Sequence, residues 1–127
     1  MSWTFYARCE EPVDLELLAG QEPCEGCRIM GEEALDESYT YNVSRMYYRA
    51  FVGTTIEQEG IRGLNNKAAR TVIPVIEHAI QYFERHREEL IVLEPLNKWG
   101  DYAGALRLLR VLLNHAQRHP RAVFLVT

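Results

Sequence analysis

The chain has 127 residues, of which 47% are hydrophobic and 25% charged, and its formal net charge is −4. A chain of this size and composition forms one globular domain with a core of its own and is not expected to be disordered. The negative charge argues against general nucleic-acid binding, and no apolar run approaches the about 20 residues that span a bilayer. We therefore expect one domain over residues 1–127, with an irregular, cysteine-containing insertion at 10–38.

The first residues, "MSWTFYARCEEP", lack the basic and apolar regions of a signal peptide. We therefore expect the protein to remain in the cytoplasm. In that compartment Cys9, Cys24 and Cys27 would be reduced, and three cysteines do not pair evenly in any case.

Both ends of the chain are predicted to be strands. Near the start, Trp3, Phe5 and Ala7 alternate with more polar residues, which is typical of a half-buried strand over 3–9. The last residues, 122–127, are β-branched and aromatic in a short run. Because a single strand is unstable, we expect the two strands to pair in a small sheet.

The first part of the region between the strands is predicted to be irregular. Residues 12–20 indicate one short helix. A brief extended segment at 39–43 leads to Ser44, the expected N-cap of a helix over 45–52. The glycine-rich residues 53–66 are typical of a long surface loop.

Apolar residues spaced by three and four predict two long helices, one running to about residue 90 and one over 102–119. Asn65 or Asn66 would cap the first helix, and Asp101 would cap the second. The stripes expected to face inward are Ala69, Val72, Ile73, Ile76, Ile80 and Phe83, then Ala105, Leu106, Leu109, Leu112, Leu113 and Ala116. The predicted fold is α+β and helix-rich, with two or three main helices packed on one face of the sheet that joins the chain ends.

A zinc site is the one cofactor that the residues suggest. The segment "PCEGCR" places Cys24 and Cys27 where both sulfurs can reach one tetrahedral metal. Cys9 would be a third ligand, and His115, His119 or a carboxylate the fourth. A second C-x-x-C motif is missing, so the alternative is a reduced loop without metal.

The segment "GIRGLNNKAAR" could cradle a phosphate. Gly60 and Gly63 allow the backbone to bend, and the free amides at the next helix start favour an anion beside Lys67 and Arg70. The segment matches no established phosphate-loop pattern, and glycine-rich loops before capped helices are common.

The segment "NKWGDY" precedes the last helix. We expect Trp99 to anchor this loop in the core between the two long helices, Gly100 to permit a sharp turn and Asn97 to bind loop backbone. Alternatively, Tyr41 and its neighbours Thr40 and Asn42 face the same loop. They would then form a polar-aromatic pocket with Asn97, Trp99 and Tyr102.

No catalytic constellation emerges from the sequence. One face of the last helix carries polar side chains, which would be a solvated surface or a contact for an acidic partner or a nucleotide: Arg107, Arg110, Asn114, Gln117, Arg118 and Arg121. An enzyme acting on nucleotides or on a modified side chain would use a histidine as proton carrier, with four candidates: His78, His86, His115 and His119.

Three segments together carry a family resemblance: "SYTYNVSRMYYRA", "AARTVIPVIEHAI" and "NKWGDYAGALRLLRVLLNHAQRHPRAVFLVT". With its T-[YH]-N-[VL] segment and its N-x-W-G-x-Y helix start, the chain resembles a family of small bacteriophage and prophage proteins, mostly without an assigned function. The resemblance covers residues 39–127. It implies a phage origin and action in the host cytoplasm, and it supplies no activity.

These observations favour a non-enzymatic binding protein that acts on a host component. The target would be a host protein or a nucleotide-like small ligand. We expect neither membrane binding nor general nucleic-acid binding. The alternatives are a small nucleotide-processing enzyme that uses a histidine, and a phage structural or assembly protein. A homo-oligomer is compatible with each of them.

Overall fold

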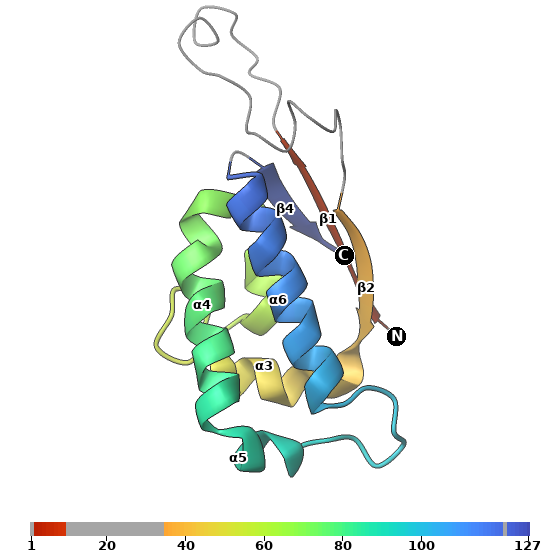
Figure 1. The fold of residues 1–127 in the computed structure, drawn as a ribbon. Coiled ribbons are helices and arrows are strands. Elements are labelled where there is room, and N and C mark those ends of the chain that lie inside the picture. Colours follow the sequence, from red (N-terminus) through yellow and green to blue (C-terminus); the bar gives the residue numbers. More distant parts are fainter. Residues whose placement is uncertain (1, 10–34, 121) are drawn as a thin grey trace, which may run out of the picture.

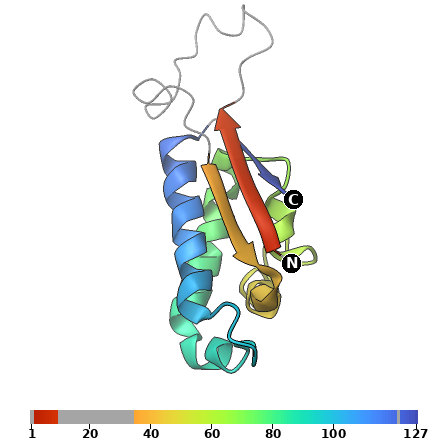
Figure 2. The ribbon, with the colours of Figure 1, turned by 90° about the vertical axis from the view of Figure 1, so that its right-hand side faces the viewer.

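A computed structural model of the chain describes residues 2–9, 35–120 and 122–127. Within these residues the fold is α+β, with a four-stranded antiparallel sheet and two long helices that cover one of its faces (Figures 1 and 2). This confirms the predicted class. The helix predicted at 12–20, and Cys24 and Cys27, lie outside the described residues.

The two chain ends form the centre of the sheet. The strand order is β2-β1-β4-β3, and all neighbours are antiparallel. The strands are β1 (Ser2–Cys9), β2 (Leu35–Thr40), β3 (Lys67–Ala68) and β4 (Ala122–Val126). The predicted pairing of the terminal strands is confirmed, with Phe5 opposite Val126. Alternate side chains of these two strands face the helices and are buried: Trp3, Phe5, Ala7, Ala122, Phe124 and Val126.

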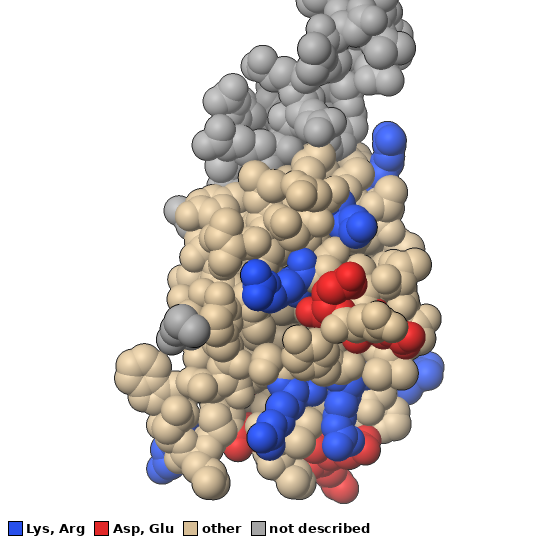
Figure 3. Space-filling model, turned by 180° about the vertical axis from the view of Figure 1, so that it is seen from behind, with Lys and Arg blue, Asp and Glu red and all other residues tan. Residues whose placement is uncertain are grey.

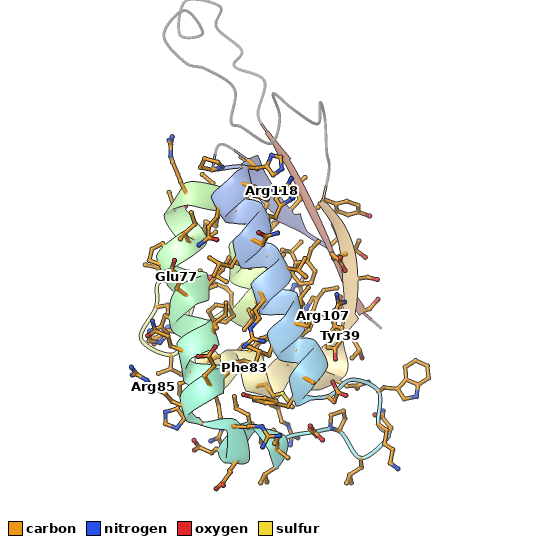
Figure 4. All side chains as sticks on the ribbon, viewed as in Figure 1. Tyr39, Glu77, Phe83, Arg85, Arg107 and Arg118 are labelled. Carbon is orange, nitrogen blue, oxygen red and sulfur yellow. The ribbon has the colours of Figure 1, made fainter. Side chains whose placement is uncertain are left out.

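The helices α4 (Ala69–Arg85) and α6 (Tyr102–Arg118) lie side by side and run in opposite directions (Figure 1). Phe83 lies at their contact (Figure 4). Nearly all members of the predicted stripes are buried, and Ile73 and Leu113 are partly buried. Leu108 is buried as well, so α6 is covered on more than one side.

The boundaries of the first long helix were predicted wrongly. Helix α4 begins after Ala68 and ends at Arg85, and a separate short helix, α5 (Arg87–Ile91), follows. Neither Asn65 nor Asn66 caps it, because the N-cap residue is Ala68. The side-chain oxygen of Asn65 instead accepts a hydrogen bond from the Val126 amide at 3.0 Å. The hydrogen bond between Asn65 and Val126 extends the pairing with β4 to the residues just before β3.

The prediction of a surface loop over 53–66 is also wrong. The segment contains a 3-10 helix, η2 (Gly60–Leu64), and three of its aliphatic side chains are buried, those of Ile56, Ile61 and Leu64. A β-carbon at Gly63 would lie 2.5 Å from that of Ile56. Glycine is therefore needed at this position because two segments pack closely there.

The segment ahead of the first described helix, α3 (Ser44–Ala50), is less extended than predicted. Strand β2 ends at Thr40, and residues 41–43 form a 3-10 turn, η1 (Tyr41–Val43). The Thr40 hydroxyl caps this turn by accepting from the Asn42 amide at 3.2 Å. Ser44, the predicted N-cap, is instead the first residue of α3.

Candidate functional site

The start of α6 is held as the sequence predicts. Asp101 is the N-cap, and its carboxylate accepts a hydrogen bond from the Gly104 amide at 2.7 Å. Tyr102 is buried, and its hydroxyl donates to the Phe83 carbonyl at the end of α4. The Tyr102 amide donates to the Glu94 carboxylate at 3.0 Å. Tyr102 therefore joins the ends of two helices and does not open into a cavity.

The predicted anchoring of the loop by Trp99 is wrong. The Trp99 side chain is 70% exposed, and Leu96 and Val92 in the same segment are 102% and 83% exposed. The buried indole is that of Trp3, at 4% exposure, which packs on Tyr41 and other rings. The Trp99 side chain is not part of the core, in which the sheet packs directly on α4 and α6.

Residues 92–100, named the Trp99 loop here, nevertheless have a defined backbone. The side-chain oxygen of Asn97 accepts from the Trp99 amide at 3.0 Å, as predicted for this residue, and the Lys98 amide donates to the Pro95 carbonyl at 3.1 Å. Lys98 and Gly100 both have positive φ, 62° and 93°. A non-glycine residue with positive φ persists where its surroundings enforce it.

The loop ends against strand β2 and turn η1. A β-carbon at Gly100 would lie 2.5 Å from a side-chain carbon of Thr40 and 2.9 Å from one of Val43, so only glycine fits there. The Tyr39 hydroxyl accepts from the Asp101 amide at 3.2 Å. Partial burial raises the pKa of Tyr39 above its usual value of 10.0, with a smaller opposing effect from its hydrogen bond to the Asp101 backbone. Thr40 therefore does face the loop as expected, but in close contact and without a cavity between them.

A pocket, named the aromatic pocket here, lies between the start of β1, η1, α3 and η2. Its volume is about 190 Å³, and its lining comprises Trp3, Tyr41, Ser44, Tyr47, Tyr48, Glu59, Ile61 and Arg62. The Trp3 ring lies 4.9 Å from the Tyr41 ring and 5.7 Å from the Tyr47 ring, centre to centre. Of this lining, only Tyr41 was a predicted site residue. The others were missed because Trp3 has the sequence pattern of a core strand and Glu59 and Arg62 lie in a segment interpreted as loop.

The structure does not gather the predicted ligand residues at one place. Tyr41 and Asn42 lie at the end of the molecule where α6 begins, whereas Arg70 lies where α6 ends, since its amide donates to the Pro120 carbonyl. The 17 residues of α6 separate these ends by about 25 Å. In Figure 4 the labelled Tyr39 lies beside the start of α6, and Arg118 lies at its opposite end.

The phosphate hypothesis for the glycine segment finds little geometric support. Gly60 and Gly63 are buried, and both pack on side chains: Gly60 on the Tyr48 ring and Gly63 on Ile56. Lys67 belongs to the edge strand β3, and the amide of Arg70 is already bonded to a carbonyl. These glycines serve packing and do not form a cradle of free amides.

The zinc hypothesis falls mostly on residues that the structure does not describe. Cys24, Cys27 and the side chain of Cys9 lie outside the described part. His115 is described, and its ring stacks on that of His119 with 4.4 Å between ring centres. Among the described residues, no group of three or more potential ligands is placed to hold a metal ion.

The polar face of α6 is partly engaged with its neighbours. Arg110 forms an ion pair with Glu84 of α4 at 3.3 Å, and Arg107 lies 3.9 Å from Glu37 of β2. Figure 3 shows the side of the molecule that faces away from α4 and α6 in Figure 1, and acidic and basic side chains lie close together there too. Exposed pairs of this kind contribute little to stability.

The histidines have structural contacts. His78 lies 3.0 Å from the Val52 carbonyl, and His86 lies 3.2 Å from the Glu89 carboxylate. None of the four lines the aromatic pocket.

None of the helices in the described ranges combines the length and the apolar character needed to cross a membrane. Comparison of the chain with protein-family models, with curated proteins and with solved structures finds no significant match.

Proposed function

We propose that this chain is a non-enzymatic binding protein and that the Trp99 loop is its contact surface for a protein partner. The single observation that carries the proposal is the 70% exposed indole of Trp99 on a loop whose backbone is held in place. Burying a large apolar side chain stabilises a fold by about 1.5–3 kcal/mol. The fold forgoes this gain at Trp99 and again at Leu96.

Exposed apolar residues concentrate in this loop. Seven large hydrophobic side chains are exposed among the described residues, and three of them are Val92, Leu96 and Trp99. Tryptophan is enriched among the few residues that dominate protein interfaces. A loop that is ordered before binding loses less conformational entropy on association. Both arguments favour a partner protein with an apolar groove that receives the Trp99 loop.

The resemblance to bacteriophage proteins supports a bacterial host protein as the partner. Occupying a host protein needs no catalytic group, which agrees with a sequence in which no catalytic constellation emerges. The cytoplasm of the host is the proposed place of action.

The proposal is tested by quantitative affinity capture from a bacterial host lysate. The wild-type chain is compared with a Leu96→Ser/Trp99→Ala double variant, and hot-spot residues of this kind predict an at least about tenfold loss of a specific partner. The matched control is Tyr6→Ser/Leu125→Ser, because these two residues are cross-strand partners on the outer face of the sheet and are 40% and 43% exposed. A partner that is lost equally from both variants, or from the control alone, would contradict the proposal.

A further inference from the structure

The aromatic pocket has the composition of a site for a single flat ring system. Four of its lining residues are aromatic: Trp3, Tyr41, Tyr47 and Tyr48. Its volume of about 190 Å³ is below the about 300–1,000 Å³ of sites for drug-sized ligands. Stacking between a base and an aromatic side chain is tolerant of sequence and contributes about 1–3 kcal/mol per base in known complexes.

The two charged side chains of the pocket, Glu59 and Arg62, are not used by the fold. The Tyr47 hydroxyl is engaged, since it donates to the Ala105 carbonyl at 2.8 Å, but Glu59 and Arg62 form no ion pair with any residue that the structure describes. Glu59 immediately precedes η2, and Arg62 lies three residues later within it. Residues three apart in a 3-10 helix share one side, so a carboxylate and a guanidinium border the same pocket.

We infer that this pocket binds a guanine-type base, independently of the Trp99 loop. The Glu59 carboxylate would accept hydrogen bonds from the base N1–H and 2-amino groups. The Arg62 guanidinium would donate to O6 and N7, which are both acceptors in guanine. The stacking surface comes from the Tyr41 and Tyr48 rings, because Trp3 and Tyr47 are only 4% and 1% exposed.

The same pair of charges disfavours other ligands. Adenine presents an acceptor at N1 toward the carboxylate and an amino donor at N6 toward the guanidinium, so both contacts become unfavourable. A simple anion would be repelled by the Glu59 carboxylate, and a simple cation would be repelled by the Arg62 guanidinium. Neither obtains the complementary pattern that a guanine edge has.

The test is a titration of the Trp99→Phe variant, in which Trp3 is the one remaining tryptophan and its fluorescence reports on the pocket. The probes are GMP, IMP, AMP and ribose 5-phosphate. We expect GMP to bind most tightly, IMP more weakly because it lacks the 2-amino group, and AMP at least about 10-fold more weakly than GMP. Thermal stabilisation by GMP provides a second readout.

Two substitutions test the assigned roles. Glu59→Gln and Arg62→Gln should each weaken GMP binding by about 5- to 100-fold, which corresponds to the loss of one bidentate contact. Both residues are exposed, so the fold should tolerate either change. Glu77→Gln and Arg45→Gln change exposed residues outside the pocket and should leave binding unchanged.

The inference is overturned if GMP changes neither the fluorescence nor the melting temperature at up to about 5 mM. Equal binding of GMP and AMP would also overturn it, as would equal binding of ribose 5-phosphate. GMP affinity that survives both pocket substitutions would do the same. Failure of any of these tests leaves partner capture by the Trp99 loop unaffected, since the loop contributes no residue to the pocket.

Discussion

The Tyr39 hydroxyl contacts both backbone polar groups of Asp101: it accepts from the amide at 3.2 Å and donates to the carbonyl at 3.4 Å. These two residues are 62 positions apart, and their contact joins the edge strand β2 to the start of α6. The Trp99 loop ends at this contact. Its position therefore depends on the sheet as well as on its own turn.

Tyr39→Phe should lower the free energy of unfolding by about 0.5–1.5 kcal/mol, because it removes one hydroxyl that forms two hydrogen bonds. Urea denaturation measures the change. Tyr48→Phe is the matched control, since that tyrosine is half exposed and its ring remains available to pack on Gly60. Equal effects of the two substitutions would show that the contact with Asp101 contributes nothing specific.

Asp101→Ala should destabilise the protein by about 0.5–2 kcal/mol, because the side chain caps α6 through the Gly104 amide. Asp101→Asn keeps a carbonyl oxygen in the same place and should restore most of the stability. Thermal denaturation of the three proteins separates capping from charge. If Asn were as damaging as Ala, the carboxylate would act through its charge and not as a cap.

The capping role of Asp101 and the pairing of the terminal strands were predictable because each depends on a local pattern. A cap needs a short polar side chain directly before an apolar helix, and a buried strand needs alternation. The exposure of Trp99 has no such signal. Its hydrophobicity predicts burial, whereas the hydrogen bond from its amide to Asn97 and the positive φ of Lys98 and Gly100 fix a loop in which its side chain lies in solvent.

The aromatic pocket was missed for a different reason. Its walls come from β1, η1, α3 and η2, and only the three-dimensional fold brings these segments together. The glycines of residues 53–66 suggested a long surface loop, but Gly63 is there because Ile56 packs against it. The spacing of Ile56, Ile61 and Leu64 was the signal for a packed segment.

Gly104→Ala tests two opposing effects. Helix propensity alone predicts stabilisation by about 1 kcal/mol within α6. The new β-carbon would, however, overlap the Tyr39 hydroxyl and displace it from Asp101. Overpacking costs about 1–3 kcal/mol, so we expect net destabilisation in urea. The double variant Tyr39→Phe/Gly104→Ala should recover part of the loss, and a stabilised single variant would contradict the contact.

Tyr47 should make the protein sensitive to alkali. Burial raises the pKa of its hydroxyl well above the usual 10.0, and the nearby Tyr39 raises it further. Above pH 10 the unfolded chain releases this proton while the folded protein keeps it, so the contribution is complete below pH 10 and is lost as the pH rises. The slope of unfolding free energy against pH should become less negative in Tyr47→Phe, by up to about 1.4 kcal/mol per pH unit. An unchanged slope would contradict this assignment.

Substitution by alanine should lower stability strongly at Trp3 and hardly at all at Trp99. Trp3→Ala removes a side chain that is 4% exposed and packs on the Tyr41 and Tyr47 rings, so it should cost about 3–5 kcal/mol and lower the melting temperature strongly. Trp99→Ala removes one that is 70% exposed and should change stability by less than about 0.5 kcal/mol. If Trp99→Ala destabilised the fold as much as Trp3→Ala, its indole would be part of the core and unavailable to a partner. If it left the fold intact and abolished partner capture, exposure of this indole would serve binding.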